Sequence, residues 1–425
     1  MKREMSMVLP AISGIGPKLR APLEFNPVLH EGRQLIVLRD PSGVASEIIG
    51  VPIELAPVLM RLDGQHSIDE IAREGSVAGI TKEVIQELVQ ELTKEGYLET
   101  PDISAKLATI KQTYLDLVVR PAQLAGIVYP EPREELEELL RNIVKRADNR
   151  FVVDGSADVR AVICPHIDYQ RGWQGYGSAF SVLSQCKKPD LIVLIGTSHY
   201  GGESIFQLGR KDFQVPNGTL KVAKEALAQL SAIYGEERSY RDEFLHKREH
   251  SLELQVPFIL EAYRDQTAPE ILPVLVGTLH PSLVSGCSPK LNSEVSDFIG
   301  GLAEVIRSYR SQGKRVLLYG GIDLSHMGRY FGDSETVCPD QLPTIEMRDR
   351  LLLEAVLAAD EEALFQHMAE DLDKRRVCGF PTLYTMLAVM RECGDSTKGH
   401  LIDYRQAVTA ESDCVVSFAS ACWTA

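Results

Sequence analysis

The sequence predicts an α/β protein in which helices flank a largely parallel β-sheet, preceded by a small α+β module of strand and helices. From about residue 119 onward, runs rich in Val, Ile and Leu alternate with helical patterns. The chain has 425 residues, which is more than one ordinary domain. We therefore expect four parts: a tail at 1–20, the module at 21–101, a helical connector at 102–118 and the main domain at 119–425.

Composition excludes several classes of protein. The chain is 44% hydrophobic and 25% charged, as in soluble globular proteins, and its net charge of −15 argues against a nucleic-acid partner. No apolar run approaches the roughly 20 residues of a membrane span, so we expect no membrane partner. The N-terminus does not read as a signal peptide, and the eight cysteines form no C-x-x-C pair. We expect reduced thiols and a cytoplasmic protein.

The module at 21–101 begins with the strand-like "RQLIVLRD" and continues with helical patterns. Ser67 and Glu70 form a capping-box signature, and Gly96 stops the last helix. The apolar residues of that helix recur at helical spacing; they are Val84, Ile85, Leu88, Val89 and Leu92. The stretch from "LDGQHSIDEIA" to "EGYLE" resembles the PqqD-like group of winged-helix-type modules, which hold peptides in ribosomal peptide modification. The resemblance implies a peptide or protein partner. A purely structural cap on the main domain is the alternative.

The main domain is expected to alternate strands and helices along the chain. In order, we expect strand "VRAVICPH", a helix near 175–186, strand "DLIVLIGTSH", a helix near 220–233, helical "HSLELQVPFILEAYRD", strand "ILPVLVGTLH", a helix near 292–310, strand "KRVLLYGG", and helices at 344–370 and 382–393.

Four apolar runs end on a histidine: His166, His199, His280 and His326. In open α/β sheets, ligands bind beyond the carboxyl ends of the strands, so we expect His166, His199 and His326 to converge. Imidazole is the commonest protein metal ligand, and about three ligands make a metal centre. Glycines before His199 and His326 are expected to let a ligand approach closely. His280 precedes Pro281 and reads as part of an ordinary loop.

Cys378 is a fourth candidate, in "RRVCGFPTL". It lies at the expected N-terminus of a helix, where the dipole and the neighbouring Arg375 and Arg376 favour a thiolate. That thiolate could be a soft metal ligand or a nucleophile.

The stretch "REHSLELQVP" adds Glu249, His250 and Glu253. These residues could orient metal ligands or carry protons. The alternative is a charge cluster at a helix N-terminus.

Several ordered motifs together resemble the Memo family, which includes the prokaryotic AmmeMemoRadiSam system protein B. The resemblance spans roughly 119–425 and rests on "RPAQLAGIVYPEPREELEELL", "PHIDY", "GTSHY", "EHSLELQVPF", "LPVLVG", "DLSHMGRYFG" and "CGFPTL". The Memo fold is similar to that of class III extradiol dioxygenases, which use non-haem iron. The resemblance therefore implies an α/β sandwich with a cleft that can bind a metal.

Carried over motif by motif, the resemblance implies metal ligands at His166, His199, His326 and Cys378. Asp323 and His250 would surround them, and Tyr169 of the Pro-His-x-x-Tyr element would lie nearby. This donor set suits iron or copper, with zinc a third choice.

The chain departs from the family pattern at two positions. Asp168 adds a carboxylate beside His166, where it could complete a facial triad with His199 or form a salt bridge with Arg171. Gln255 replaces a family histidine and removes one proton carrier.

Three functions fit these residues. The first is an iron- or copper-dependent redox protein, similar to a dioxygenase, with His326 or His250 as acid or base. The second is a non-catalytic scaffold or peptide-binding partner in a radical-SAM-associated system. The third is a thiol hydrolase with Cys378 as nucleophile, His326 as base and Asp323 orienting it. No phosphate-binding glycine loop is found, so we expect no nucleotide cofactor.

Overall fold

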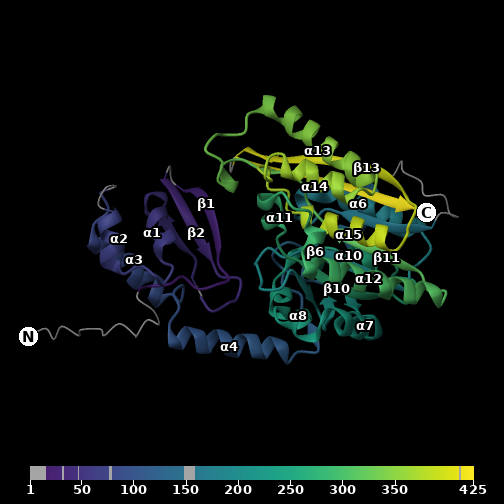
Figure 1. The fold of residues 1–425 in the computed structure, drawn as a ribbon, viewed down its shortest axis with the longest axis horizontal. Coiled ribbons are helices and arrows are strands. Elements are labelled where there is room, and N and C mark those ends of the chain that lie inside the picture. The colour runs from purple at the N-terminus through teal and green to yellow at the C-terminus, as the bar shows by residue number, and fades with distance from the viewer. Residues whose placement is uncertain (1–15, 31–32, 46, 76–78, 148–157, 411–412) are drawn as a thin grey trace, which may run out of the picture. The chain divides into compact units, whose positions relative to one another are not determined.

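The computed structural model describes residues 16–30, 33–45, 47–75, 79–147, 158–410 and 413–425. The chain divides into two compact units (Figure 1). The smaller unit is formed mainly by residues up to Asp116, and the larger by Leu117–Arg329 with Asp333–Ala425. Most of the expected N-terminal tail, residues 1–15, lies outside the described residues.

The smaller unit contains an antiparallel three-stranded sheet in the order β1-β2-β3, followed by helices. Its elements are β1 Glu24–His30, β2 Arg33–Arg39, β3 Ile49–Pro52, α1 Ala56–Arg61, α2 Ile68–Gly75, α3 Lys82–Lys94 and α4 Pro101–Leu115. This is an α+β unit, and its likeness to a winged helix stays a prediction.

Local capping explains where the helices of this unit begin and end. The capping box is confirmed: Glu70 N–H donates to Ser67 Oγ, and Ser67 N–H donates to the Glu70 carboxylate at 2.8 Å. At the start of α3 the Thr81 hydroxyl accepts the Val84 N–H, and Gly96 follows the end of that helix with a positive φ of 83°. The apolar face of α3 is buried in the core of this unit, except Val84, which is exposed.

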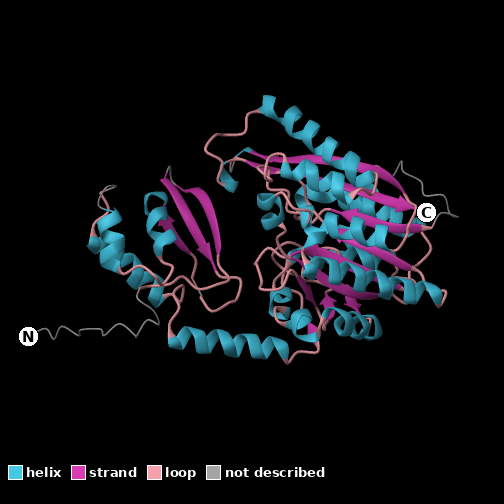
Figure 2. Cartoon of the chain, in the orientation of Figure 1, coloured by secondary structure: helices cyan, strands magenta, loops and turns pink. Residues whose placement is uncertain are grey.

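The larger unit is built on an eight-stranded mixed sheet (Figure 2). Its order is β12-β14-β5-β11-β6-β10-β7, with β13 paired to β14. The strands are β5 Val159–Cys164, β6 Leu191–Thr197, β7 Phe206–Leu208, β10 Glu270–Val276, β11 Val316–Gly321, β12 His326–Met327, β13 Lys398–Thr409 and β14 Cys414–Thr424. A smaller sheet comprises β4 Val119–Arg120, β8 Asp212–Val215 and β9 Gly218–Leu220.

The expectation of a largely parallel sheet holds only for the centre. β5, β11, β6 and β10 run parallel, and they carry the buried apolar runs seen in the sequence. The strands outside them, β7, β12, β13 and β14, pair antiparallel. The long hairpin of β13 and β14 was not predicted from the sequence.

Helices cover both faces of the sheet. They are α5 Arg133–Arg146, α6 Tyr169–Gln185, α7 Lys224–Tyr234, α8 Glu236–Tyr240, α9 His250–Glu253, α10 Val256–Ala262, α11 His280–Ser285, α12 Ser293–Ser311, α13 Leu342–Leu357, α14 Glu361–Ala369 and α15 Phe380–Glu392. A Cβ on Gly320 would meet Met386 of α15, whereas one on Gly321 would meet Ser251 of α9. Because consecutive strand residues point to opposite faces, α15 and α9 lie on opposite sides.

Some helix boundaries differ from the expected ones. The predicted helix at 344–370 is two helices, because the chain turns at Ala359 with a φ of 54°. The segment from His250 to Ala262 is likewise two short helices, the second with Pro257 in its first turn. Among the described residues, no helix is both long enough and apolar enough to cross a membrane.

Candidate metal centre

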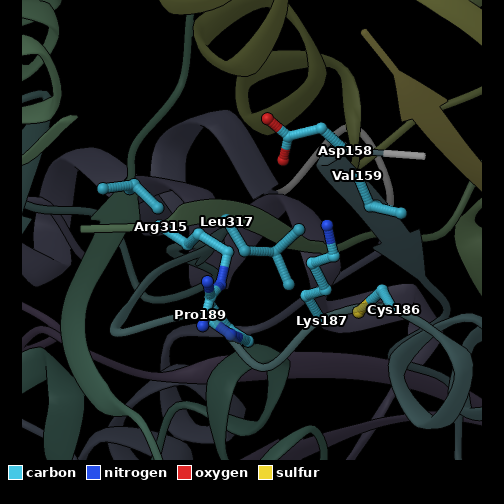
Figure 3. Close-up of a pocket in the computed structure, with 8 residues that line it drawn as sticks. Asp158, Val159, Cys186, Lys187, Pro189, Arg315 and Leu317 are labelled. Carbon is cyan, nitrogen blue, oxygen red and sulfur yellow. The ribbon is translucent and has the colours of Figure 1, made fainter. Parts of the chain in front are cut away.

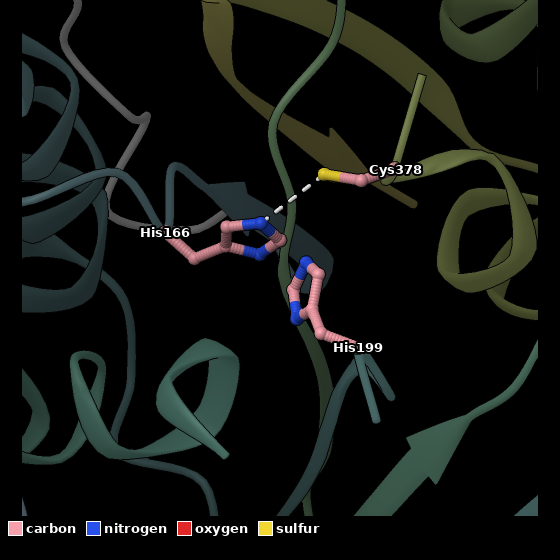
Figure 4. A group of neighbouring side chains, drawn as sticks. All are labelled: His166, His199 and Cys378. Carbon is pink, nitrogen blue, oxygen red and sulfur yellow. Dashed lines mark hydrogen bonds between the residues drawn. The ribbon is translucent and has the colours of Figure 1, made fainter. Parts of the chain in front are cut away.

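Three of the predicted site residues meet at the carboxyl ends of the parallel strands. His166 follows β5, His199 follows β6, and Cys378 lies just before α15. One ligand atom from each lies within 4.8 Å of the other two. Figure 4 shows the two imidazoles and the thiol facing one another. The convergence follows from parallel strand order, which brings these ends to the same edge of the sheet.

His166 is held in one tautomer. Its Nδ1 lies 3.0 Å from the carbonyl oxygen of Gly321, which can only accept, so Nδ1 carries the proton. Its Nε2 is then an acceptor and lies 3.2 Å from Cys378 Sγ. The ring is buried, and burial together with the charges of His199 and His250 lowers its pKa well below the ordinary value. A neutral imidazole with an unprotonated Nε2 is the form that binds metals.

Glu249 holds two further histidines in place. Its buried carboxylate accepts hydrogen bonds from the His199 backbone N–H at 2.9 Å and from His199 Nδ1 at 3.0 Å. His250 Nδ1 lies 3.2 Å from the same carboxylate. The two rings stack with centroids 4.5 Å apart, and ligand atoms of the three residues lie within 4.8 Å of one another. Burial raises the pKa of Glu249, but the charges of His199 and His250 outweigh it, so the net shift is downward.

His326 belongs to neither of these two groups among the described residues. Its Nδ1 lies 2.9 Å from the carbonyl oxygen of Leu324 and 3.1 Å from that of Arg376. Burial lowers its pKa to about 4. His326 therefore borders the centre as a neutral ring, fixed by backbone carbonyls. His280, the fourth strand-end histidine, lies outside both groups and begins α11.

The expected stabilisation of a Cys378 thiolate is not found. Burial raises the pKa of the thiol well above its ordinary value, and the charge of Asp323 raises it further. Arg375 and Arg376 do not counter this, because their guanidinium groups pair with Asp349 and Asp333, each at a closest distance below 3 Å. The thiol is protonated in the free site and donates to His166 Nε2.

Asp323 does not orient His326, contrary to the hydrolase hypothesis. Its carboxylate accepts the His166 backbone N–H at 3.0 Å, and its Oδ2 lies 3.7 Å from His166 Nε2. Burial raises the pKa of Asp323 to about 7. It therefore braces the backbone that presents His166.

The remaining candidates have structural partners. Asp168 caps α6 through the Arg171 N–H and forms a 2.6 Å ion pair with the Arg171 side chain, the second of its two expected roles. The Tyr169 hydroxyl donates to the Leu254 carbonyl within an aromatic cluster. Glu253 is buried in an ion pair of 2.6 Å with Arg120.

Sequence reasoning missed the role of the strand-end glycines. A Cβ on Gly321 would lie 2.2 Å from the Ser251 carbonyl oxygen, and one on Gly196 would lie 2.4 Å from Ser251 Oγ. These glycines admit α9 against β6 and β11, which brings Glu249 and His250 to His199. The double glycine "GG" at the end of an apolar run was the available signal.

A small cavity lies at the other end of the parallel strands (Figure 3). Its volume is about 10 Å³, which is room for one water molecule. Its lining comes from the segments that enter β5, β6 and β11: Asp158, Val159, Cys186, Lys187, Pro189, Arg315, Val316 and Leu317. This cavity is therefore too small to hold a substrate.

Comparison with known proteins agrees with the resemblance noted in the sequence. The family model described as "Memo-like protein" matches residues 120–422. This chain belongs to the Memo-like family. A MEMO1 family protein of Aquifex aeolicus is 28% identical over 388 residues, covering 90% of this chain and 94% of that protein. A MEMO1 family protein of Thermus thermophilus is 26% identical over 324 residues, covering 76% and 89%.

The Memo-like relatives differ in how much of the chain they share. A MEMO1 family protein of Nitrosopumilus maritimus is 21% identical to this chain. The match covers 71% of this chain and 98% of that protein. The Aquifex relative matches too much of the chain to be confined to the Memo region, so it shares part of the smaller unit. An uncharacterised Escherichia coli K12 protein of solved structure has 12% identity and a TM-score of 0.35, covering 62% of this chain and 99% of its own, a similarity too weak to carry an inference.

The donor chemistry of the Memo-like site fits a metal ion. His166 Nε2 is unprotonated, and the backbone and Glu249 take the Nδ1 protons of both histidines. A thiol of raised pKa becomes a thiolate when a cation lies beside it. His166, His199 and Cys378 could therefore hold a metal.

Proposed function

We propose that this Memo-like protein is a metal-dependent redox protein that binds iron or copper through His166, His199 and Cys378. The observation that supports the proposal is the convergence of two imidazoles and a thiol within 4.8 Å, from segments up to 212 residues apart. Two nitrogens with one sulfur form a softer set than the two histidines and one carboxylate of non-haem iron oxygenases. Iron or copper bound there would supply one-electron and dioxygen chemistry, as dioxygenases use it.

The surrounding residues have separate tasks. Gly321 O and Glu249 hold the ring orientations of His166 and His199. His250 is a third exposed in its side chain, and its ring centroid lies 5.2 Å from that of His166. With Nδ1 held against Glu249, Nε2 of His250 is placed to accept or return a proton at the edge of the centre.

Metal content tests the proposal. The protein is expressed without a His-tag, purified anaerobically and measured by inductively coupled plasma mass spectrometry. We expect near-stoichiometric iron or copper, lost in His166→Ala, His199→Ala and Cys378→Ala. Matched controls are Cys287→Ala, which removes an exposed thiol, and His400→Ala in β13, outside both groups.

Two results would contradict the proposal. One is a folded wild-type protein that contains neither iron nor copper after growth with these metals. The other is equal metal loss in the Cys287 or His400 controls. Retained metal justifies a measurement of oxygen consumption, and zinc alone would argue for hydrolytic rather than redox chemistry.

A thiol hydrolase is the second candidate, favoured by the 3.2 Å contact between Cys378 Sγ and His166 Nε2. In this arrangement His166, rather than His326, is the base. The raised pKa of the thiol works against it. Alkylation of Cys378 by iodoacetamide in metal-free protein at pH 7 tests it: rapid, His166-dependent reaction supports the hydrolase, and slow reaction argues against it.

A scaffold role remains the third proposal. It would rest on the smaller unit as a peptide-binding module within a radical-SAM-associated system. In that case, alanine at His199 or Cys378 removes metal and leaves partner binding intact.

A further inference from the structure

A cavity of about 140 Å³ shares Cys378 with the candidate metal centre. It lies where the ends of β6 and β10 meet α11 and the start of α15. Its lining is Thr197, Ser198, Gly277, Thr278, Leu279, His280, Leu283, Asp373, Val377, Cys378, Phe380 and Pro381. A molecule in this cavity would lie against the residue that carries the thiol.

The volume restricts what can enter. Drug-sized and nucleotide-sized ligands occupy pockets of roughly 300–1,000 Å³, which is well above this cavity. A benzene ring, by contrast, fits an apolar cavity of about 150 Å³. A ligand that lies wholly inside the cavity is therefore about the size of one six-membered ring.

The lining of the cavity includes both apolar and polar residues. Leu279, Leu283, Val377 and Phe380 are buried side chains that offer apolar contacts. The polar residues of the lining are Thr278, His280 and Asp373, together with two residues whose hydroxyls already donate elsewhere. Those two are Thr197, which donates to the Cys378 carbonyl, and Ser198, which donates to the Gly201 carbonyl.

The polar groups suit an uncharged hydroxyl group. Thr278 Oγ1 accepts the His280 backbone N–H, so the imidazole and the Thr278 hydroxyl proton remain as donors. The Asp373 carboxylate accepts the Val377 N–H and has further lone pairs to accept a ligand hydroxyl. A ligand hydroxyl both donates and accepts, whereas a ligand carboxylate would be repelled by Asp373.

We propose that this cavity binds a small uncharged hydroxyl compound of single-ring size and presents it to the metal centre at Cys378. The proposal that such a compound binds rests on the cavity alone. The presentation to a metal rests on the proposed function.

Phenol and benzoate are the test probes, because they share a ring and differ in charge at pH 7.5. Binding to metal-free, full-length protein is measured by saturation-transfer NMR and calorimetry. We expect phenol to bind and benzoate to bind at least tenfold more weakly. Asp373→Asn keeps a residue that tolerates the left-handed backbone at this position, where φ is 56°. This variant should narrow or reverse the preference for phenol over benzoate, because it removes the charge that repels benzoate.

Two further variants keep the result interpretable. His280→Ala, at an exposed position, should weaken phenol binding about tenfold, and His400→Ala should leave it unchanged. Equal binding of phenol and benzoate, or an unchanged preference in Asp373→Asn, would overturn the inference. Absence of phenol binding in wild-type protein would do the same.

Copper loading separates this inference from the proposed function. If both hold, Cu²⁺ bound to the protein broadens the phenol proton lines, and His166→Ala, which removes a proposed metal ligand outside the lining of the cavity, abolishes the broadening but not phenol binding. If phenol binds and no metal is retained, the cavity stands and the proposed function fails. If metal is retained and phenol does not bind, the proposed function stands and the cavity inference fails.

Discussion

Glu249 holds in place His199, the residue that the two groups of the candidate centre share. Its carboxylate accepts hydrogen bonds from the backbone N–H and the ring Nδ1 of His199 and from the backbone N–H of Ser251. The ring of His250 forms an ion-pair contact with the same carboxylate. It is buried, and its negative charge is balanced by donors on three sides. The residue therefore fixes which nitrogen of His199 faces His166 and Cys378.

Glu249→Gln should weaken metal binding by about 10–100-fold, the usual cost of losing a partner that orients a ligand. The amide keeps the shape but places an N–H against donors that need an acceptor. Competition with a chromophoric chelator measures the affinity. Glu203→Gln, at a side chain 77% exposed, is the control and should bind metal like the wild type. Equal affinities in the two variants would show that Glu249 does not orient His199.

The short helix α9 is the element that the two strand-end glycines position. It reaches β6 and β11 only because Gly196 and Gly321 lack a Cβ. Gly321 also supplies the carbonyl that fixes His166, so one position controls both the packing of α9 and the tautomer of a ligand. A close approach between two backbone segments therefore explains the glycine at this strand end. The sequence pattern had suggested a different reason, which was access for a ligand.

Gly321→Ala should destabilise the protein by about 1–3 kcal/mol, the usual cost of overpacking, and lower its metal content. Gly300→Ala in α12 is the matched control, because a Cβ there meets nothing within 4 Å. The control protein should be as stable as the wild type, or more stable by up to about 1 kcal/mol. Urea unfolding and metal analysis measure both. A Gly321→Ala protein as stable and as metal-rich as the wild type would contradict the packing argument.

At the scale of the whole molecule, buried neutral histidines make the fold sensitive to acid. His246 is the clearest case: burial lowers its pKa from 6.5 to about 4, and the charge of Arg120 acts in the same direction. The Gln207 carbonyl, which accepts from Nε2, and the carboxylates of Glu243 and Glu249 oppose that shift. Because the unfolded chain binds the proton more readily, this stability is present above pH 6.5 and is lost as pH falls through 4.

Metal-free wild-type protein should therefore lose unfolding free energy between pH 6.5 and pH 4. His246 alone contributes up to about 3 kcal/mol of that loss, at about 1.4 kcal/mol for each pKa unit. His246→Gln keeps an N–H donor and does not titrate, so its stability should fall less steeply. Urea unfolding at pH 7, 5.5 and 4.5 measures the slopes. Parallel slopes for the two proteins would show that the pKa of His246 is the same in the folded and the unfolded chain.

The sequence by itself determined the alternation of strands and helices, the position of His166 and His199 at strand ends, and the Memo-like motifs. These are local properties, since apolar runs, capping residues and motif spacing depend on neighbours along the chain. The tertiary structure decided the rest. The hairpin of β13 and β14, the contact between Cys378 and His166 across 212 residues, and the direction of the Cys378 pKa depend on residues distant in sequence. Burial and nonlocal hydrogen bonds set the protonation of a side chain, and neither can be read from the residues beside it.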